Sequence, residues 1–485
     1  MKYPRKEFIR LAAFAGIGFY LQGCNTRQQP KAISASDSTA LKPPINTTTA
    51  NSGVVYIKKG EARYDELRQG FNKRIDKYPA IIALCSNTEQ VAEAVQYAKA
   101  NNLPVAVKSG GHCLEGFSCN NDGMVINLSQ LNSIEWLADD EVKFGPACRL
   151  AQVHNELLPK GRIIPAGSCG SVGIGGLTLG GGYGMFSRDY GLTCDSLLEV
   201  TMVDGYGMVR NSKDDADLLW ACRGGGSGNF GVITEMKFKT QQAPATLVAH
   251  RFRAYKVDAA RAAAITDKWM EIGANLPAGC FSALVLNGKT LLILLTCFNP
   301  ASDLSEIIMQ FTAITDKPSL GKYRELSSAL KVFYGEQQPV YFKNSCGGMY
   351  RNFGEVIPFI ESVYDVIINN PGMIYSIGTL GGAIGKKEFE AVSAYPHRQF
   401  TFLGELQAYW EDPAREEHYT TQSRKVIDIL EANHVEAEYR NYPSLDFTNW
   451  QKKYFGNDNY SRLQQIKKKY DPDNLFRYEQ SVELA

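Results

Sequence analysis

The chain has 485 residues, of which 44% are hydrophobic and 21% charged, so its composition is that of a globular protein long enough for two packed units. Its 52 basic and 51 acidic residues nearly cancel, which leaves no electrostatic argument for a nucleic-acid partner or an anionic membrane surface. The eleven cysteines include no Cys-x-x-Cys pair, so a structural zinc site has no support and no metal is expected.

The N-terminus has the features of an export signal. A basic stretch, residues 1–10, precedes the apolar run 11–21, which is too short to span a bilayer. The run ends in LQGC, which resembles a bacterial lipobox with Cys24 as the lipidated residue. The preceding PRKEFIR resembles a twin-arginine signal with Lys as the second basic residue; an ordinary signal peptide is the alternative. We expect a signal peptide over 1–23, a flexible tether over 24–52, and a mature chain anchored in the periplasm or at the cell surface only through lipid on Cys24.

The first folded unit is predicted to mix helices and strands. Apolar residues at helical spacing predict a helix from Thr88 to Asn101, with Ser86 or Asn87 as its cap. Short apolar segments bounded by Gly and Pro predict strands at 81–84, 105–107 and 124–126, followed later by 198–203 and 232–238. The composition shifts between 241 and 246, and apolar strands such as 291–295 follow. We therefore expect a domain boundary near residue 240.

Two glycine-rich motifs predict close approach of a ligand to the backbone. Residues 107–112 (VKSGGH) run from a strand into two glycines, whose N–H groups can form a nest for phosphate oxygens, with His112 beside them. A capping or core histidine is the alternative. Glycine is also dense from Gly167 to Gly184, which we interpret as bare backbone against a flat ring or a pyrophosphate, because core packing does not ask for so many glycines.

A third glycine run, Gly226 to Gly231, matches the pattern G-x-G-x-x-G. A dinucleotide-binding fingerprint needs a strand before the run and a helix after it. Here 217–223 is expected to be helical and 232–238 to be a strand, so we reject that interpretation.

Several motifs occur together and in order: KSGGH at 108–112, the run 169–184, WACRGGG at 220–226, NFGV at 229–232, NYPSLD at 441–446, and KYDPDNLF at 469–476. Together they resemble the berberine-bridge-enzyme-like family of FAD-linked oxidases, over about residues 54–483. The resemblance implies an α+β fold with a two-subdomain, PCMH-type FAD-binding domain (53–240) and a substrate domain whose antiparallel sheet is covered by helices (241–437). The segment 438–485 would return to complete the FAD domain.

The resemblance also implies roles for individual residues. FAD would be bonded through its 8α carbon to His112 and through C6 to Cys169, and Tyr442 would be the catalytic base. Val172 falls on a position that controls oxygen access, and its small size favours an oxidase. Leu177 departs from the His of many plant members. The residues that we expect to bind the cofactor are His112, Cys169, Lys108, Ser109, Gly110, Gly111, Val172, Gly173, Gly175, Gly176, Gly181, Gly182, Tyr183, Gly184 and Val232.

A tyrosine ionises near pH 10, so Tyr442 must be activated to act as a base near neutrality. A nearby Lys or Arg, or an anionic network, could do this. The Asp that assists the tyrosine in sugar-oxidising members is missing from 375–382 (YSIGTLGG). A packed aromatic is the alternative for Tyr442.

Residues Glu405, Gln407 and Tyr409 alternate and therefore share one face of a predicted strand. That face could line a substrate cleft or be the solvated side of an ordinary sheet. We name Gln407, Tyr409 and Tyr439 as candidate substrate residues.

The resulting hypothesis is an FAD-dependent oxidase that takes hydride from a CH–OH group of a small substrate, such as a saccharide, and uses O2, giving hydrogen peroxide. One alternative is a dehydrogenase with another electron acceptor. Another, from a different class, is a lipid-anchored flavin- or ligand-binding protein without turnover.

Overall fold

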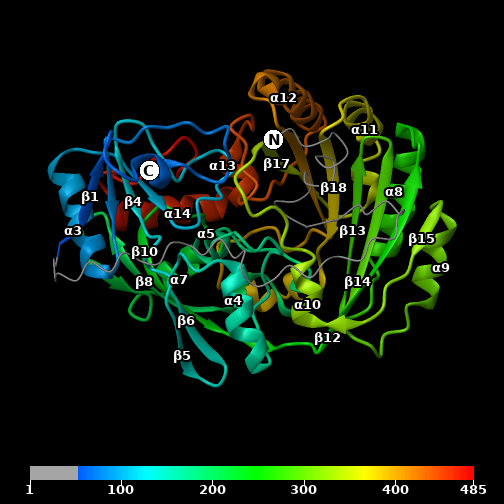
Figure 1. The fold of residues 1–485 in the computed structure, drawn as a ribbon, viewed down its shortest axis with the longest axis horizontal. Helices are drawn as coiled ribbons and strands as arrows, with labels where there is room; N and C mark the ends of the chain where they lie inside the picture. The colour runs from blue at the N-terminus through cyan, green and yellow to red at the C-terminus, as the bar shows by residue number, and fades with distance from the viewer. Residues whose placement is uncertain (1–52) are drawn as a thin grey trace.

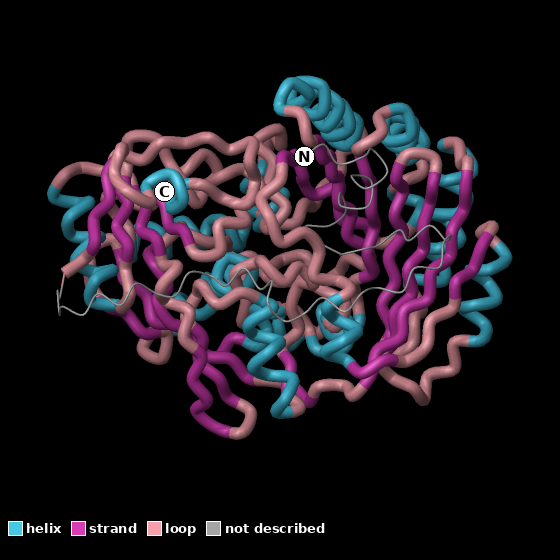
Figure 2. The backbone as a smooth tube through the Cα atoms, in the orientation of Figure 1, coloured by secondary structure: helices cyan, strands magenta, loops and turns pink. Residues whose placement is uncertain are grey.

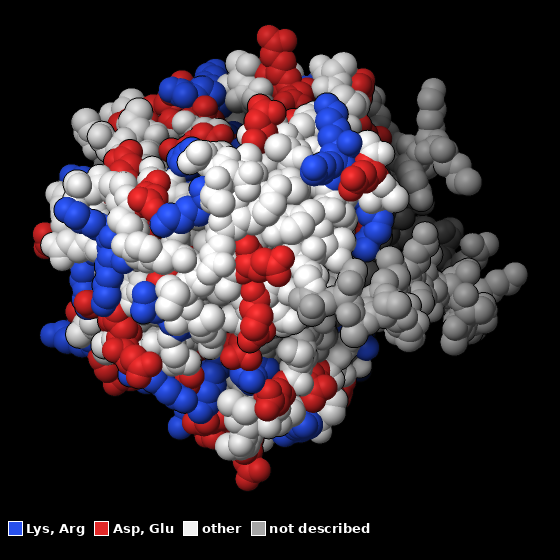
Figure 3. Space-filling view, turned by 90° about the vertical axis from the view of Figure 1, so that its left-hand side faces the viewer, with Lys and Arg blue, Asp and Glu red and all other residues white. Residues whose placement is uncertain are grey.

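The structure is a computed structural model that describes residues 53–485; the predicted signal, the tether and Cys24 lie outside this part. Two lobes lie side by side, with two smaller sheets in one lobe and a large sheet in the other (Figure 1). The middle of the molecule, between the lobes, consists mostly of loops (Figure 2). Both signs of charge are interspersed over the outer face of the first lobe (Figure 3), as expected from the balanced composition.

The first lobe contains a four-stranded sheet in the order β1-β2-β4-β3, in which β2, β4 and β3 run parallel. Its strands are β1 (Val55–Lys58), β2 (Ile81–Leu84), β3 (Val105–Lys108) and β4 (Met124–Asn127). Helix α3 (Thr88–Ala100) begins after Asn87, whose side chain accepts a hydrogen bond from the Gln90 N–H at 2.8 Å. The helix buries its apolar face between this sheet and the next one, as its spacing predicts.

The second sheet of this lobe is five-stranded and antiparallel, in the order β5-β6-β10-β8-β9. Its strands are β5 (Ile134–Ala138), β6 (Glu141–Phe144), β8 (Leu197–Asp204), β9 (Val209–Asn211) and β10 (Gly231–Lys239). Helix α7 (Ala216–Cys222) precedes the run Gly226 to Gly231 and β10 follows it, which confirms that the run is no dinucleotide fingerprint. The remaining helices are α2 (Tyr64–Arg68), α4 (Leu150–Leu157), α5 (Ile174–Leu179) and α6 (Ser187–Tyr190), and β7 (Arg162–Ile163) pairs with β11 (Gln241–Gln242).

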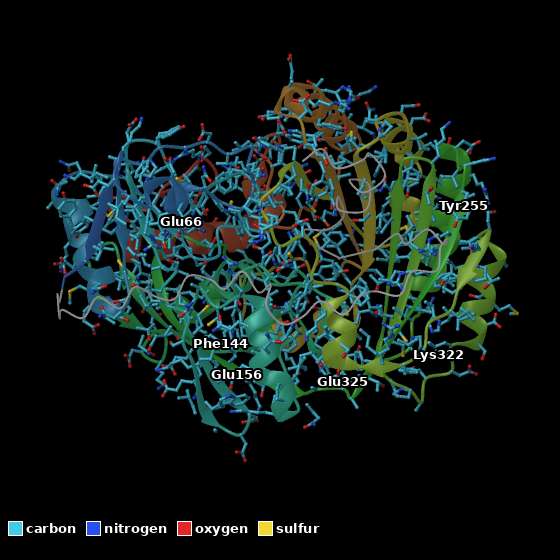
Figure 4. All side chains as sticks on the ribbon, in the orientation of Figure 1. Glu66, Phe144, Glu156, Tyr255, Lys322 and Glu325 are labelled. Atoms are coloured by element: carbon cyan, nitrogen blue, oxygen red, sulfur yellow. The ribbon has the colours of Figure 1, made fainter. Side chains whose placement is uncertain are left out.

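The second lobe is built on an eight-stranded antiparallel sheet, ordered β15-β12-β14-β13-β18-β19-β17, with β16 paired to β12. Its strands are β12 (Thr246–Tyr255), β13 (Cys280–Asn287), β14 (Thr290–Cys297), β15 (Lys317–Ser319), β16 (Arg324–Glu325), β17 (Tyr341–Tyr350), β18 (Met373–Thr379) and β19 (Phe402–Trp410). Its helices are α8 (Ala259–Gly273), α9 (Ser305–Ala313), α10 (Leu326–Lys331), α11 (Ile360–Asn369) and α12 (Glu416–Ala432). Glu325, labelled in Figure 4, caps α10.

Helices cover one face of the large sheet and leave the other face toward the first lobe. On the covered face, Tyr419 of α12 stacks on Trp410 of β19 with ring centroids 5.5 Å apart. Because side chains alternate along a strand, Tyr409 points the opposite way and packs with Leu114 of the first lobe. The mixed architecture, with an antiparallel sheet covered by helices, confirms the predicted fold class.

The C-terminal segment, which contains α13 (Trp450–Phe455) and α14 (Asn457–Tyr470), lies in the first lobe. The Val105 N–H donates to the Leu475 carbonyl at 2.9 Å, and Phe476 forms a parallel bridge with Val105 at the free edge of β3. The ammonium of Lys467, which is fully buried, binds the Asp471 carboxylate at 2.6 Å and the Asn229 carbonyl at 2.8 Å. The end of the chain is therefore part of the first lobe's core.

Candidate active site and cofactor cavity

A cavity in the first lobe is lined by residues of that lobe and of the C-terminal segment, with an empty volume of about 1460 Å³ that includes solvent at its mouth. Four stretches far apart in the sequence contribute most of its wall: 105–118, 167–183, 227–233 and 439–443. Its apolar residues include Val105, Leu128 and Ile233. The cavity therefore combines apolar walls, glycine-rich loops and reactive side chains, and it has room for a ligand larger than a simple metabolite.

Glycines make the wall of this cavity possible. A Cβ on Gly110 would lie 2.5 Å from the Gly173 nitrogen, so the two glycine loops touch backbone to backbone. Gly176, in contrast, has nothing within 4 Å of the place where a Cβ would be, although it lines the cavity. A bare stretch of backbone there leaves space for a flat ring, as FAD requires, and the loops supply the close approach expected from the sequence.

His112 and Cys169, predicted to hold the flavin, both line this cavity. The His112 ring stacks on Phe71, with centroids 4.0 Å apart. Burial, together with the positive charge of Arg149, lowers the pKa of His112 to about 3, so the imidazole is neutral and keeps a free electron pair. Cys169 Sγ lies 3.4 Å from Ser171 Oγ, and burial raises the pKa of its thiol.

Tyr442 lies in the wall of the same cavity, edge-on to Tyr439 with ring centroids 5.1 Å apart. The Tyr439 hydroxyl accepts hydrogen bonds from the Gly182 N–H at 2.8 Å and from Asn441 Nδ2 at 3.0 Å. Tyr439 is thus held by two donors and orients its neighbour. Burial raises the pKa of Tyr442 well above its ordinary value, and the nearby Glu405 raises it further.

No Lys or Arg of residues 53–485 is among the largest influences on the pKa of Tyr442, all of which raise it. The hydroxyl is therefore protonated near neutral pH. It can take a proton from a substrate only while it passes its own proton on.

The strand face carrying Glu405, Gln407 and Tyr409 is buried, so the solvated-face alternative is wrong. Three acceptor oxygens on this face and on the paired β17 are buried without a hydrogen-bond partner within the described chain: Asn344 Oδ1, Glu405 Oε1 and Gln407 Oε1. Burial raises the pKa of Glu405 to about 8. The face thus carries buried acceptors without donors, but none of Asn344, Glu405, Gln407 and Tyr409 lines the cavity itself.

Tyr409 is positioned by its partners. Its hydroxyl accepts a hydrogen bond from Asn344 Nδ2 at 3.0 Å, and its ring packs with Phe342 and Tyr442. Tyr409 therefore connects β19 to the tyrosine of the cavity wall.

Of the other predicted cofactor residues, Ser109, Gly110, Gly111, Val172, Gly173, Gly175, Gly176 and Tyr183 line the cavity. Leu177 lines it as well.

Five predicted cofactor residues lie outside the wall, and strand alternation explains two of them. Gly231 and Ile233 face the cavity, so Val232 between them points away and is buried against α3. The side chain of Lys108 leaves β3 on the side away from the cavity and donates to the Leu67 carbonyl at 2.6 Å.

The other three, Gly181, Gly182 and Gly184, are glycines because protein atoms crowd them. A Cβ on Gly184 would lie 1.8 Å from the Ala166 carbonyl oxygen, and one on Gly182 would lie 2.2 Å from Thr193 Oγ1. Gly181 has φ +123° and faces the rings of Tyr395 and Tyr439. Core packing thus does require part of the glycine run, contrary to the interpretation from sequence.

Arg440, Asn441 and Tyr478 line the cavity but were missed from the sequence. Asn441 Nδ2 donates to the Leu177 carbonyl at 2.8 Å and so ties the Tyr442 segment to helix α5. Its place directly before Tyr442 was the available signal. No sequence signal identified Tyr478, because its contact with the cavity depends on the return of the C-terminal segment.

Comparison with known proteins places this site in a class. A family model described as "FAD binding domain" matches residues 79–213, and "Berberine and berberine like" matches residues 438–483. The chain is 29% identical over 444 residues to an uncharacterized FAD-linked oxidoreductase, YgaK, of Bacillus subtilis, covering 88% of this chain and 96% of that one. It is 27% identical over 469 residues to the chitooligosaccharide oxidase of Gibberella zeae, covering 90% and 94%.

A solved structure of glucooligosaccharide oxidase from Acremonium strictum, described with a 6-S-cysteinyl, 8α-N1-histidyl FAD, superposes with a TM-score of 0.80. It covers 89% of this chain and 97% of that chain at 24% sequence identity, which shows a shared fold.

Fold and site together define an FAD-linked oxidoreductase. Residues 79–213 match a family model of an FAD-binding domain and residues 438–483 a berberine-like one, and the chain is similar over most of its length to berberine bridge enzyme-like proteins. The cavity fits this cofactor, since it joins glycine loops, apolar walls and a neutral histidine in one space. Within residues 53–485, every helix is too short or too polar to cross a membrane.

Proposed function

We propose that this protein is an oxidase with bicovalently attached FAD that oxidises a hydroxyl group of a saccharide-like substrate. The observation that carries the proposal is that His112, Cys169 and Tyr442 all line one cavity. FAD bound there would supply the hydride acceptor and, on reoxidation by O2, the route to hydrogen peroxide. The chain itself must bind the substrate and move its hydroxyl proton.

We infer that the proton leaves through Tyr442 and Glu405. The phenol is protonated at neutral pH, so it accepts the substrate proton as it gives up its own. Glu405 is the carboxyl group that acts on Tyr442; with a pKa of about 8 it accepts the proton in its ionised form, whose share grows as the pH approaches 8. Glu405 thus takes the place of the Asp that is missing from 375–382.

A saccharide is favoured by the acceptor-rich face of β17 and β19, which adjoins the cavity through the packing of Tyr409 against Tyr442. Asn344 Oδ1, Glu405 Oε1 and Gln407 Oε1 are buried without a donor among the described residues, and buried acceptors are stabilised when a ligand hydroxyl donates to them. Two relatives of this fold are named as oligosaccharide oxidases. A polyhydroxylated ligand is the chemical class that supplies several donors at once.

The oxidase is distinguished from a dehydrogenase by the product of reoxidation. Val172 lines the cavity and its small side chain leaves room for O2. A panel of mono- and oligosaccharides should yield one hydrogen peroxide for each substrate oxidised. Turnover with an artificial electron acceptor but without peroxide would identify a dehydrogenase, and an unbleached flavin under anaerobic exposure to the whole panel would support a binding protein without turnover.

The two covalent bonds are tested separately from turnover. After acid denaturation, flavin should stay with the wild-type protein, and the intact mass should include one FAD. His112→Ala and Cys169→Ala should each keep the flavin through the remaining bond, whereas the double variant should release it. Release of all flavin from the wild-type protein by acid contradicts the proposal.

We propose an exported, lipid-anchored location, which rests on the sequence 1–24 alone. Metabolic labelling with a fatty acid should mark the wild-type protein and not Cys24→Ser. An unlabelled wild-type protein in the cytosolic fraction would reject both export and anchoring.

A further inference from the structure

Arg440 is a buried guanidinium with no counter-charge in the described chain. Arg440 is 7% exposed, and no carboxylate of residues 53–485 lies within ion-pair distance of its guanidinium. Its Nη2 donates to the Tyr478 hydroxyl at 3.0 Å, and its Nε is buried without a partner. A buried cation is costly unless an anion or strong acceptors compensate it.

Other buried arginines are compensated. Arg398, 3% exposed, binds the Asp195 carboxylate at 2.7 Å, and Arg68, 8% exposed, binds Asp76 at 2.6 Å. Arg188, which is half-buried, donates to three backbone carbonyls, among them Cys280 at 3.1 Å. Around Arg440 stand aromatic rings instead: its guanidinium lies 5.3 Å from the Tyr454 centroid and 5.7 Å from that of Phe117. These rings favour a cation but do not neutralise it.

The position of Arg440 indicates what its partner is. Arg440 lines the cofactor cavity together with Ser227 and Gly228 of the third glycine run. A Cβ on Gly226, where φ is +89°, would lie 3.2 Å from Arg440 Nε, so this turn can sit against the guanidinium only as glycine. The Tyr478 hydroxyl donates to the Ser227 carbonyl at 2.8 Å and so holds the turn and the arginine in one unit.

We propose that Arg440 is the counter-charge of the FAD pyrophosphate. The inference rests on FAD occupying this cavity, as the proposed function requires. Of the parts of FAD, the pyrophosphate carries its negative charge in every redox state, so it compensates the arginine in the resting enzyme as well as during turnover. A guanidinium also offers paired N–H donors that match phosphate oxygens.

The test is ³¹P NMR of the holoenzyme, combined with FAD affinity. In Arg440→Gln the pyrophosphate resonances should shift from their wild-type positions. In the His112→Ala, Cys169→Ala background, where FAD binds without a covalent bond, Arg440→Gln should weaken FAD binding roughly tenfold to a hundredfold. Arg440→Lys keeps the positive charge but loses the paired N–H donors. Its resonances and its FAD affinity should therefore lie between those of the protein with Arg440 and of Arg440→Gln.

Arg462→Gln is the matched control, because this exposed arginine of α14 pairs with Asp217 and does not line the cavity. It should leave the resonances and the affinity unchanged. If Arg440→Gln does not fold, the comparison is made with Arg440→Lys alone.

Unchanged pyrophosphate resonances in a folded Arg440 variant, with FAD affinity within about twofold of the parent, would overturn the proposal. A lowered midpoint potential of the flavin in the variant, at unchanged FAD affinity, would also overturn it, since the guanidinium would then interact with the flavin ring and not with the pyrophosphate. Neither readout depends on substrate, covalent attachment or oxidase activity, so a failure here differs from a failure of the proposed function.

Discussion

At the scale of single residues, the hydroxyl of Tyr442 is the group on which turnover is expected to depend. Tyr442→Phe removes the proton carrier and keeps the ring that packs with Tyr439 and Tyr409. We expect kcat to fall roughly 10²- to 10⁴-fold while the flavin content stays as in the wild type. Stopped-flow reduction of the flavin measures this step directly. A Phe variant that reduces its flavin at the wild-type rate would return Tyr442 to the role of a packed aromatic.

Glu405 links pH to stability in a direction opposite to that of most carboxyl groups. Burial raises its pKa to about 8 from an ordinary value of 4.5, so the folded state binds a proton that the unfolded state releases. The stability that this proton contributes is fully present below pH 4.5 and is lost as the pH rises through 8.

Glu405→Gln removes that contribution to the pH dependence. The wild-type protein should lose stability relative to the variant as the pH rises over this range, measured by urea unfolding at several pH values. Glu438, whose pKa burial raises to about 7, remains in both proteins and cancels in the difference. Parallel curves for the two proteins would mean that the carboxyl group of Glu405 is ionised in the fold.

At the scale of elements, a buried charge cluster joins the His112 loop, strand β17 and the Tyr442 segment. Lys343 of β17 binds the Glu115 carboxylate, the Ser444 hydroxyl at 3.0 Å and the Asp446 carboxylate at 3.0 Å. Arg74 binds the other oxygen of Glu115 at 2.6 Å. Since Glu115 follows His112 and Ser444 follows Tyr442 closely in sequence, the cluster sets the distance between the histidine and the tyrosine.

Lys343→Met leaves the Glu115 carboxylate, which is 1% exposed, without one of its two cations. We expect a loss of about 3–5 kcal/mol in the free energy of unfolding, because one partner of a buried ion pair is removed. Lys237→Met breaks the more exposed pair with Glu141 and should cost less than about 1 kcal/mol. Urea titrations followed by circular dichroism compare the two, and equal midpoints would show that the cluster adds no stability.

The elements also show what the sequence could predict. Periodicity located α3, and short apolar runs located β2, β3 and β4 but not β1, because burial leaves a local pattern. The glycine motifs identified the wall of the cavity. The sequence could not show that Gly231 and Ile233 line the cavity while Val232 points away from it. Strand alternation shows only that neighbours face opposite ways, not which face meets the ligand.

The sequence did not identify Arg440 as a site residue for a related reason. Whether a guanidinium is paired depends on which segments fold against it, and those are residues 113–117, 226–228 and 478, all distant in sequence. The same holds for Gly184, whose need for a bare backbone comes from the Ala166 carbonyl. Contacts between distant segments leave no trace in a local motif.

At the scale of the whole molecule, the first lobe needs the C-terminal segment to complete its core. Removal of 471–485 takes away Asp471 and leaves the ammonium of Lys467 buried and unpaired, and it frees the edge of β3. We expect this truncation to abolish soluble, flavin-loaded protein. Removal of Leu484 and Ala485 alone, which are exposed, should change neither yield nor flavin content. Normal flavin loading of the longer truncation would show that the first lobe closes without its C-terminal segment.

His112 and Cys169 line one cavity although a long stretch of chain separates them, and this has a mechanical consequence if both bind the same flavin. The cofactor then acts as a cross-link that closes a covalent ring in the polypeptide, like a disulfide made of an aromatic system. A ring that persists in the denatured chain lowers its entropy and should stabilise the fold by about 4 kcal/mol relative to Cys169→Ala, which keeps the flavin on a single bond. Thermal unfolding of the two flavin-loaded proteins measures the difference, and the doubly attached chain should also run as a more compact species in a denaturing gel.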